Sequence, residues 1–327
     1  MPLSLRRGRV TAVVEEHEGL VRLEVDGGAC IAYPQLTGPV EVEDEVLVNV
    51  QARELGLGSG GFDVLYANLT RGLEVPAAEG AHVMKLPYTP LQWAERHVEE
   101  VGKLAASLDG MPVVCCSLHS QLAPVCAGLE GKRVGYVQLP GGALSVPLSD
   151  TVRLLRSREL LAATVSAGPC FGGEVETVGV PSALAWAVEE GCEAVVCAIG
   201  PGIVGTGTSL GHGGLAAADA ANASVALGGR PVLAARISSA DERDRHRGVS
   251  HHTRAVLSLC RDGVTVAWPA GLEAPEWVDA RAEVEVDSWR EACAGLPLSH
   301  MGRGPDEEPW FFAAAFAAGK LAGSLAG

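Results

Sequence analysis

After about residue 78, the chain repeats one pattern: a short apolar run, a polar or glycine-rich turn, and an amphipathic segment. Apolar runs that are continuous, rather than alternating with polar residues, are typical of parallel strands covered on both faces. Strands of this kind are predicted near residues 82–86, 112–118, 133–139, 162–167, 194–199, 231–237 and 264–267. We therefore expect an α/β fold built on a doubly wound, mostly parallel sheet with helices on both faces.

The N-terminal part follows a different pattern, because apolar and polar residues alternate with period two from Arg9 to about Leu69. Such alternation predicts short antiparallel strands that form a small β-barrel-like module ahead of the α/β fold. The segment Val75–Ala78 separates a β module at residues 1–75 from an α/β ligand-binding domain at residues 76–327. One predicted strand carries four acidic residues, which favour a packing or oligomerisation role over nucleic-acid binding: Glu41, Glu43, Asp44 and Glu45.

A helix start is marked shortly after this boundary. Thr89, Pro90 and Gln92 have the residue types of an N-cap, a first helical residue and the N3 position of a capping box. The pattern predicts a helix that runs to about Leu108.

The most informative motif follows the predicted strand that ends at Ile199. The sequence Gly200-Pro-Gly-Ile-Val-Gly-Thr-Gly-Thr208 resembles an anion-binding turn before a helix, because glycines allow positive φ and free N–H groups favour phosphate or carboxylate. We predict that the following residues bind the ligand: Gly200, Gly202, Gly205, Thr206 and Thr208. The alternative that these glycines serve only a tight crossover turn stays open.

The spacing Gly200-x-Gly202-x-x-Gly205 also fits the dinucleotide fingerprint. That fingerprint needs an acidic residue at the end of the next strand to hold the ribose, and the nearest acid, Asp241, lies too far along the chain. An NAD(P)-dependent oxidoreductase is therefore the third hypothesis.

Other polar or reactive residues also follow predicted strands, and the carboxyl ends of parallel strands share one rim of a sheet. The predicted catalytic residues there are His119, His251, Asp241 and Cys170. Further predicted ligand-binding residues are Gly172, Gly173, Arg243, Arg245 and His252. No histidine, cysteine or acidic pair has a diagnostic metal spacing, so the cofactor is unassigned and a divalent metal stays open.

Within this set, Ser250 has the position of an N-cap, and His251 and His252 open a helix that reaches about Cys260. A helix N-terminus disfavours protonated histidine, which suits these residues to accept a proton or to ligate a metal. The flanking arginines would also hold a phosphate at this helix start. The alternative is a solvated loop of alternating charge.

Composition limits the partners. The net charge is −15 with acidic residues spread along the chain, which argues against nucleic acid and anionic membranes and leaves a small anionic ligand. Nine cysteines without a C-x-x-C pair predict reduced thiols in a cytoplasmic protein, and no signal peptide is expected. The apolar tail at residues 310–327 is too short to span a membrane and predicts a buried or subunit-interface helix, so a homo-oligomer stays open.

Four motifs in order resemble the bacterial family called domain of unknown function 3866: His119–Leu122, Cys170–Glu174, Gly200–Thr208 and Arg245–Thr253. The resemblance spans nearly the whole chain and implies a bacterial protein without an assigned reaction. From the residues themselves, we expect a hydrolase or group transferase that binds a phosphorylated or nucleotide-like small molecule, with His251 or His119 as the base. A non-catalytic metabolite-binding or sensing protein is the main alternative.

Overall fold

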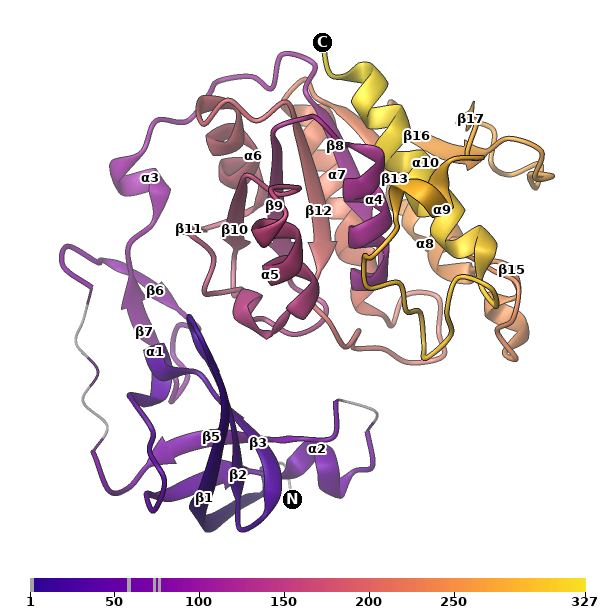
Figure 1. Cartoon of the computed structure of the whole chain (residues 1–327). Coiled ribbons are helices and arrows are strands. Elements are labelled where there is room, and N and C mark those ends of the chain that lie inside the picture. The colour runs from indigo at the N-terminus through magenta and orange to yellow at the C-terminus, as the bar shows by residue number, and fades with distance from the viewer. Residues whose placement is uncertain (1–2, 58–59, 73–74, 76–77) are drawn as a thin grey trace. The chain divides into compact units, whose positions relative to one another are not determined.

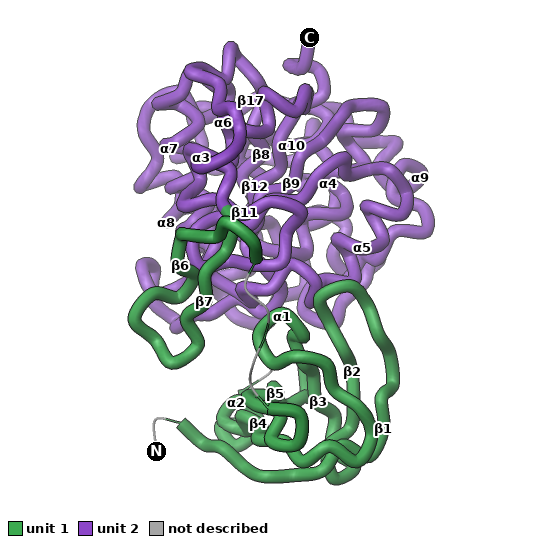
Figure 2. Tube along the Cα trace, turned by 90° about the vertical axis from the view of Figure 1, so that its left-hand side faces the viewer, with its two compact units in different colours: residues 1–96 green, residues 97–327 purple. Residues whose placement is uncertain are grey.

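The computed structural model describes residues 3–57, 60–72, 75 and 78–327, and two compact units divide it. The first unit comprises residues 1–96 and the second residues 97–327, as the two colours of Figure 2 show. The predicted linker spans residues 75–78, and residues 76 and 77 of it lie outside the described residues.

The first unit contains a closed barrel of five strands (Figure 1). They are β1 (Leu5–His17), β2 (Leu20–Val25), β3 (Gly28–Ala32), β4 (Glu45–Asn49) and β5 (Asp63–Asn68), in the order β1-β2-β3-β5-β4. Only the β3–β5 pair is parallel. Alternate residues such as Val46 and Val48 fill the interior, so the period-two pattern correctly predicted a β-barrel-like module. Short helices α1 (Pro34–Thr37) and α2 (Gln51–Glu54) join the strands.

The acidic segment before β4 forms a turn and not a strand, because β4 begins at Glu45. Asp44 is buried there and accepts hydrogen bonds from Arg71 (2.7 Å) and Asn68 (2.8 Å). Part of the acidic charge in this segment therefore holds the turn together.

The predicted helix from Thr89 to Leu108 is wrong. Strands β6 (Val83–Lys85) and β7 (Trp93–Glu95) form a hairpin, and only the one-turn helix α3 (Val98–Val101) follows. The capping-type residues serve the hairpin turn, since Thr89 accepts from the N–H of Leu91 (3.3 Å) and Gln92 accepts from that of Tyr88 (2.9 Å). These side chains satisfy a turn as readily as a helix start.

The second unit is built on an eight-stranded parallel sheet with the order β11-β10-β9-β12-β8-β13-β16-β17. Its strands are β8 (Pro112–Cys116), β9 (Val134–Leu139), β10 (Ala163–Ala167), β11 (Val175–Thr177), β12 (Ala194–Ile199), β13 (Arg230–Ala234), β16 (Thr265–Pro269) and β17 (Arg281–Val284). All neighbouring pairs in it are parallel, so the predicted α/β class is confirmed. The short edge strands β11 and β17 were not predicted.

Helices cover both faces of this sheet (Figure 1). One core contains α4 (Leu122–Gly128), α5 (Asp150–Ser157), α9 (Trp289–Ala292) and α10 (Pro309–Leu325). The other contains α6 (Val180–Glu189), α7 (Ala216–Ala226) and α8 (His251–Leu259). The neighbouring strands β8 and β12 lead into α4 and α7, which lie on opposite faces, and such a switch point is where ligands bind in open α/β sheets.

The C-terminal helix α10 is buried along most of its length, which confirms the prediction of a buried helix. No helix among the described residues is long and apolar enough to cross a membrane. The free cysteines, Cys260 excepted, are all buried.

Helices α4 and α10 approach each other through Gly128 and Gly319, and a Cβ on Gly319 would overlap the backbone oxygen of Val125. We expect Gly319→Ala to lower the free energy of unfolding by about 2 kcal/mol, because backbone overlap outweighs the gain in helix propensity. Urea unfolding measures this effect.

Gly323→Ala is the matched control on the same helix, since its Cβ would lie 3.4 Å from the oxygen of Gly128. This change is expected to leave stability unchanged or raise it by up to about 1 kcal/mol. Equal losses in both variants would contradict close packing at Gly319.

Candidate functional site

Four histidines from two distant segments meet in the second unit, and we call them the histidine cluster: His212, His246, His251 and His252. The rings of His212 and His252 are stacked with centroids 3.7 Å apart, and those of His251 and His252 are 4.5 Å apart. His246 lies 4.8 Å from His251 by the same measure. The loop after β12 and the segment around the start of α8 are therefore neighbours in space.

Local structure places the cluster. Ser250 caps α8 by accepting from the N–H of His252 (3.2 Å), as predicted, and its hydroxyl lies 2.7 Å from Nδ1 of His246. The two-residue strands β14 (Ile237–Ser238) and β15 (Gly248–Val249) pair with each other, and this pairing holds together the ends of the loop that carries His246. One serine thus fixes two histidines of the cluster.

A buried arginine that the sequence analysis did not select lies beside the cluster. Arg236 follows β13 by two residues and is 2% exposed. Its Nη1 donates to Nδ1 of His252 (3.0 Å), its Nη2 lies 3.5 Å from Asp241, and its Nε has no hydrogen-bond partner among the residues that the structure describes. Burial lowers the pKa of Arg236 to about 10, so the side chain is still charged at neutral pH.

The histidines of the cluster are neutral at pH 7. Burial lowers the pKa of His246 to about 3 and that of His252 to about 2, and the charge of Arg236 lowers both further. The pKa values of His212 and His251 are also lowered, first by burial. This agrees with the predicted neutral state of the first-turn histidines, although burial and the arginines, rather than the helix dipole alone, produce it.

Asp241 is a structural anchor rather than the predicted catalytic group. It is 3% exposed and accepts from Nε (2.8 Å) and Nη2 (2.7 Å) of Arg243, while Arg303 and Arg236 each lie 3.5 Å away. Hydrogen bonds from Arg243 hold the pKa of this carboxyl well below its usual range. A carboxylate with three arginines around it cannot take up a proton near neutral pH.

The glycine-rich loop does not lead directly into a helix, contrary to the prediction. The first helical turn after it is the 3-10 turn Gly213–Leu215, and α7 starts at Ala216. Gly200 allows close approach to another loop instead, because a Cβ there would overlap the backbone oxygen of Ala143. Gly202 has a φ of +74°, and Gly205 pairs with His212 in an antiparallel bridge. The sequence could not distinguish glycines that cradle a ligand from those that let two loops touch.

The tip of this loop is exposed. The hydroxyls of Thr206 and Thr208 lie 2.9 Å apart, and the N–H of Thr206 donates to the oxygen of Gly211 (2.6 Å). A Cβ on Gly207 would lie 3.9 Å from the guanidinium of Arg245. The tip of the predicted anion loop and a predicted anion-binding arginine are therefore adjacent.

Both ring nitrogens of His119 make hydrogen bonds within the fold. Its Nδ1 lies 3.1 Å from the carbonyl oxygen of Ile199 and its Nε2 lies 2.7 Å from the hydroxyl of Ser149, which also caps α5. Since a carbonyl only accepts, Nδ1 carries the proton and Ser149 donates to Nε2. Burial lowers the pKa of His119 to about 4. Both ring nitrogens are in use, so His119 is not a free base.

In the turn between β10 and β11, the N–H groups of Gly172 and Gly173 donate hydrogen bonds to nearby residues. The thiol-bearing residue Cys170 is fully buried. The N–H of Gly172 donates to Glu176 and that of Gly173 to Ser166, both at 2.8 Å. These groups are therefore engaged within the turn and are not free for the ligand-binding roles predicted from sequence.

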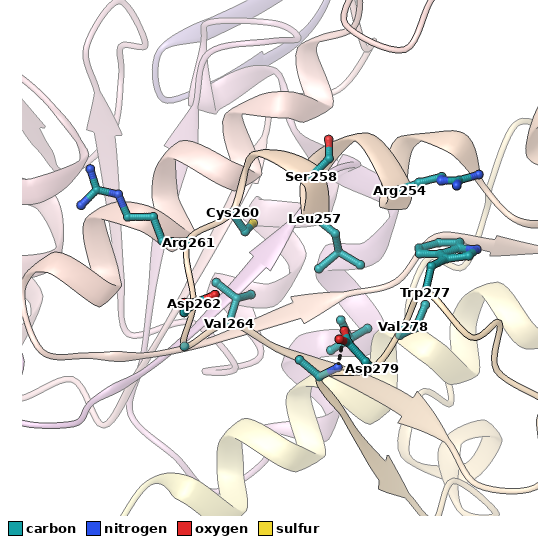
Figure 3. A pocket seen from close by; sticks show the side chains of 13 residues that line it. Arg254, Leu257, Ser258, Cys260, Arg261, Asp262, Val264, Trp277, Val278 and Asp279 are labelled. Atoms are coloured by element: carbon teal, nitrogen blue, oxygen red, sulfur yellow. Dashed lines mark hydrogen bonds between the residues drawn. The ribbon is translucent and has the colours of Figure 1, made fainter.

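A separate pocket of about 410 Å³ lies at the other end of α8 (Figure 3). Its lining includes Arg254, whose guanidinium lies 5.5 Å from the ring centre of Trp277, and Arg261 on the opposite side. None of the residues predicted to bind ligand lines this pocket.

Comparison with known proteins gives one family match. A family model described as "Protein of unknown function (DUF3866)" matches residues 29–319. A search of curated proteins found no match.

Proposed function

The chain belongs to this family of unknown function, and we propose that it is a hydrolase or group transferase that binds a phosphorylated or nucleotide-like small molecule beside the histidine cluster. The ligand's anionic group would lie between the exposed tip of the loop at residues 202–211 and Arg245. His251 would act as the base.

The observation that carries this proposal is the close approach of Arg245 to Gly207, where a Cβ on the glycine would lie 3.9 Å from the guanidinium. It joins two segments that are more than thirty residues apart and that both have the residue types of an anion site. The surroundings are cationic in a chain of net charge −15, since Arg236, Arg243 and Arg303 share Asp241. An anion would therefore gain attraction here that most of the surface does not offer.

The proposed chemistry uses a neutral imidazole next to a guanidinium. His251 is half-buried, and its lowered pKa keeps it unprotonated at neutral pH. It would accept the proton of a water or hydroxyl as the oxygen bonds to phosphorus. The leaving oxygen departs with the bonding electron pair and takes a proton from solvent, while Arg245 stabilises the charge on the phosphoryl oxygens.

A non-catalytic metabolite-binding protein is the second candidate. It is favoured by one observation, namely that His119 and Asp241 serve the fold and do not join His251 as free catalytic groups. An NAD(P)-dependent oxidoreductase stays third, because Gly200 and Gly205 have packing roles that need no dinucleotide.

The proposed setting is the cytoplasm of a bacterium. Only four of 25 basic residues are lysine, a bias that GC-rich bacterial genomes produce, and the free cysteines suit a reducing compartment. We propose a small anionic ligand as partner, with no nucleic acid and no membrane, and leave assembly into a homo-oligomer open.

We expect Arg245→Ala to weaken binding of inorganic phosphate and AMP by about 10-fold or more, because one charge-assisted contact is lost. Thermal-shift titrations at pH 7.5 measure the affinity. Arg247→Ala is the matched control, since Arg247 lies two residues away and its partners in the described part of the chain are exposed, Asp244 among them.

Equal affinity in wild type and Arg245→Ala would overturn the proposed anion site. Phosphorus NMR of AMP or a sugar phosphate incubated with the protein separates the first two candidates. A new phosphorus signal supports the enzyme, and binding without turnover across the panel supports the metabolite-binding protein.

A further inference from the structure

We infer that His212, His251 and His252 form a binding site for one divalent transition-metal ion of the zinc type. Each of these histidines offers a ring nitrogen, and the three nitrogens lie within 4.8 Å of one another. The three come from the loop after β12 and the first turn of α8, so an ion would join these two segments.

The second observation is a set of buried nitrogens without partners. His212 is 6% exposed, and among the described residues neither of its ring nitrogens makes a hydrogen bond of normal distance and angle, although the backbone of Ser209 lies close enough to raise its pKa. Nε2 of His251 is also buried and unpartnered. A buried polar atom without a partner is destabilising, and a metal ion would satisfy two of these nitrogens at once.

The donor set selects the class of metal. Three neutral imidazoles suit zinc, cobalt, nickel and copper, whereas magnesium and calcium require oxygen ligands. The buried carboxylate Asp241 is already held by arginines.

With the ion bound, His251 is a ligand and cannot also be the base of the proposed function, so that role belongs to the metal-free protein. Two adjustments accompany loading. In a tetrahedral site the ligand nitrogens lie about 3.3 Å apart, so the stacked rings of His212 and His252 must turn toward a common centre. Arg236 donates to Nδ1 of His252, which places the proton of that ring on Nε2. The guanidinium must therefore move toward Asp241, 3.5 Å away, before His252 can bind a metal through Nε2 and carry its proton on Nδ1.

This account makes Arg236 a competitor of the metal. Its charge and its hydrogen bond to His252 both oppose a cation, so removing them should tighten metal binding. The same change should weaken anion binding at the neighbouring proposed site, because a positive charge is lost. The two proposals therefore predict opposite effects of Arg236→Gln.

The experiment measures zinc bound to the full chain by equilibrium dialysis after removal of metals with EDTA, in phosphate-free buffer at pH 7.5. We expect one equivalent per chain, and a loss of at least 10-fold in affinity for His212→Ala and His251→Ala. His246→Gln, a change in the same cluster outside the three ligands, should retain binding. Cobalt in place of zinc should show the intense visible absorption of a four-coordinate site in wild type and lose it in His212→Ala.

Circular dichroism confirms that each variant is folded, and His212→Asn replaces His212→Ala if the latter is not. Less than half an equivalent of zinc, or unchanged affinity in the His212 and His251 variants, would overturn the inference. If the protein binds zinc but neither phosphate nor AMP, the proposed function is wrong and the metal site is supported. If it binds phosphate but not zinc, the metal site is wrong and the proposed function is supported.

Discussion

Lowering the pH from 7.5 to 5.5 is expected to reduce the free energy of unfolding of the second unit by about 5.5 kcal/mol. The main contributors are His119, His246, His252 and His300, which are held neutral by burial. A histidine in the unfolded chain has a pKa near 6.5, whereas burial lowers that of His300 to about 3. Over this range each residue contributes about 1.4 kcal/mol.

The sign follows from which state binds more protons. Because the folded-state pKa values are depressed, the stabilisation is fully present above pH 6.5 and is lost as the pH falls toward the folded-state values. The unfolded chain takes up protons over this range while the folded cluster does not. Carboxylates contribute little, since their ordinary pKa values lie near 4.

Urea unfolding followed by tryptophan fluorescence at pH 7.5, 6.5 and 5.5 measures the effect, because every tryptophan except Trp93 lies in the second unit. His246→Gln should reduce the pH dependence by about a quarter, as one of four proton-binding groups is removed. A free energy that stays constant between pH 7.5 and 5.5 would show that the histidines are not buried and neutral.

The central strands could be predicted because they are buried on both faces. Residues 194–199 form an uninterrupted apolar run, and the structure has β12 over the same residues. The edge strands β11 and β17 were missed because Val175–Thr177 and Arg281–Val284 are short and contain charged residues. Strands of this type depend on a neighbouring strand more than on their own pattern.

The candidate site was predicted in part. The N-cap at Ser250 is a local signal, and it placed His251 and His252 correctly at the start of α8. The contact of His212 with His252 joins residues forty positions apart, and nothing in the sequence marks it. Arg236 follows an apolar strand and resembles an ordinary strand-end residue, so only the structure identifies it as a buried charge.

Asp241 shows how a residue type that favours a catalytic role can have a structural role in the fold. A carboxylate in a strand-end loop next to histidines has the composition of a catalytic group. The structure surrounds it with the guanidiniums of Arg236, Arg243 and Arg303, so it neutralises a buried arginine and fixes two others. Its contribution is therefore to stability and to the position of Arg236.

Asp241→Asn is expected to lower the free energy of unfolding by about 3–5 kcal/mol, because removing one partner of a buried ion pair leaves the other charge uncompensated. Arg236 is affected most, since it is 2% exposed and the other hydrogen bond of its guanidinium is to the neutral His252. Urea unfolding at pH 7.5 measures the loss. The amide has nearly the same shape as the carboxylate, so the effect reports the lost charge together with the hydrogen bond that its NH2 group cannot accept from Arg243.

Asp244→Asn is the matched control in the same loop, because the Asp244 side chain is 93% exposed and pairs with the exposed Arg247. Exposed pairs of this kind contribute less than about 1 kcal/mol. If Asp241→Asn were as stable as Asp244→Asn, the arginines would not depend on this carboxylate, and a catalytic role for Asp241 would again be open. If it is destabilised as expected, a loss of phosphate binding in the same variant reports misplaced arginines and not a missing acid or base.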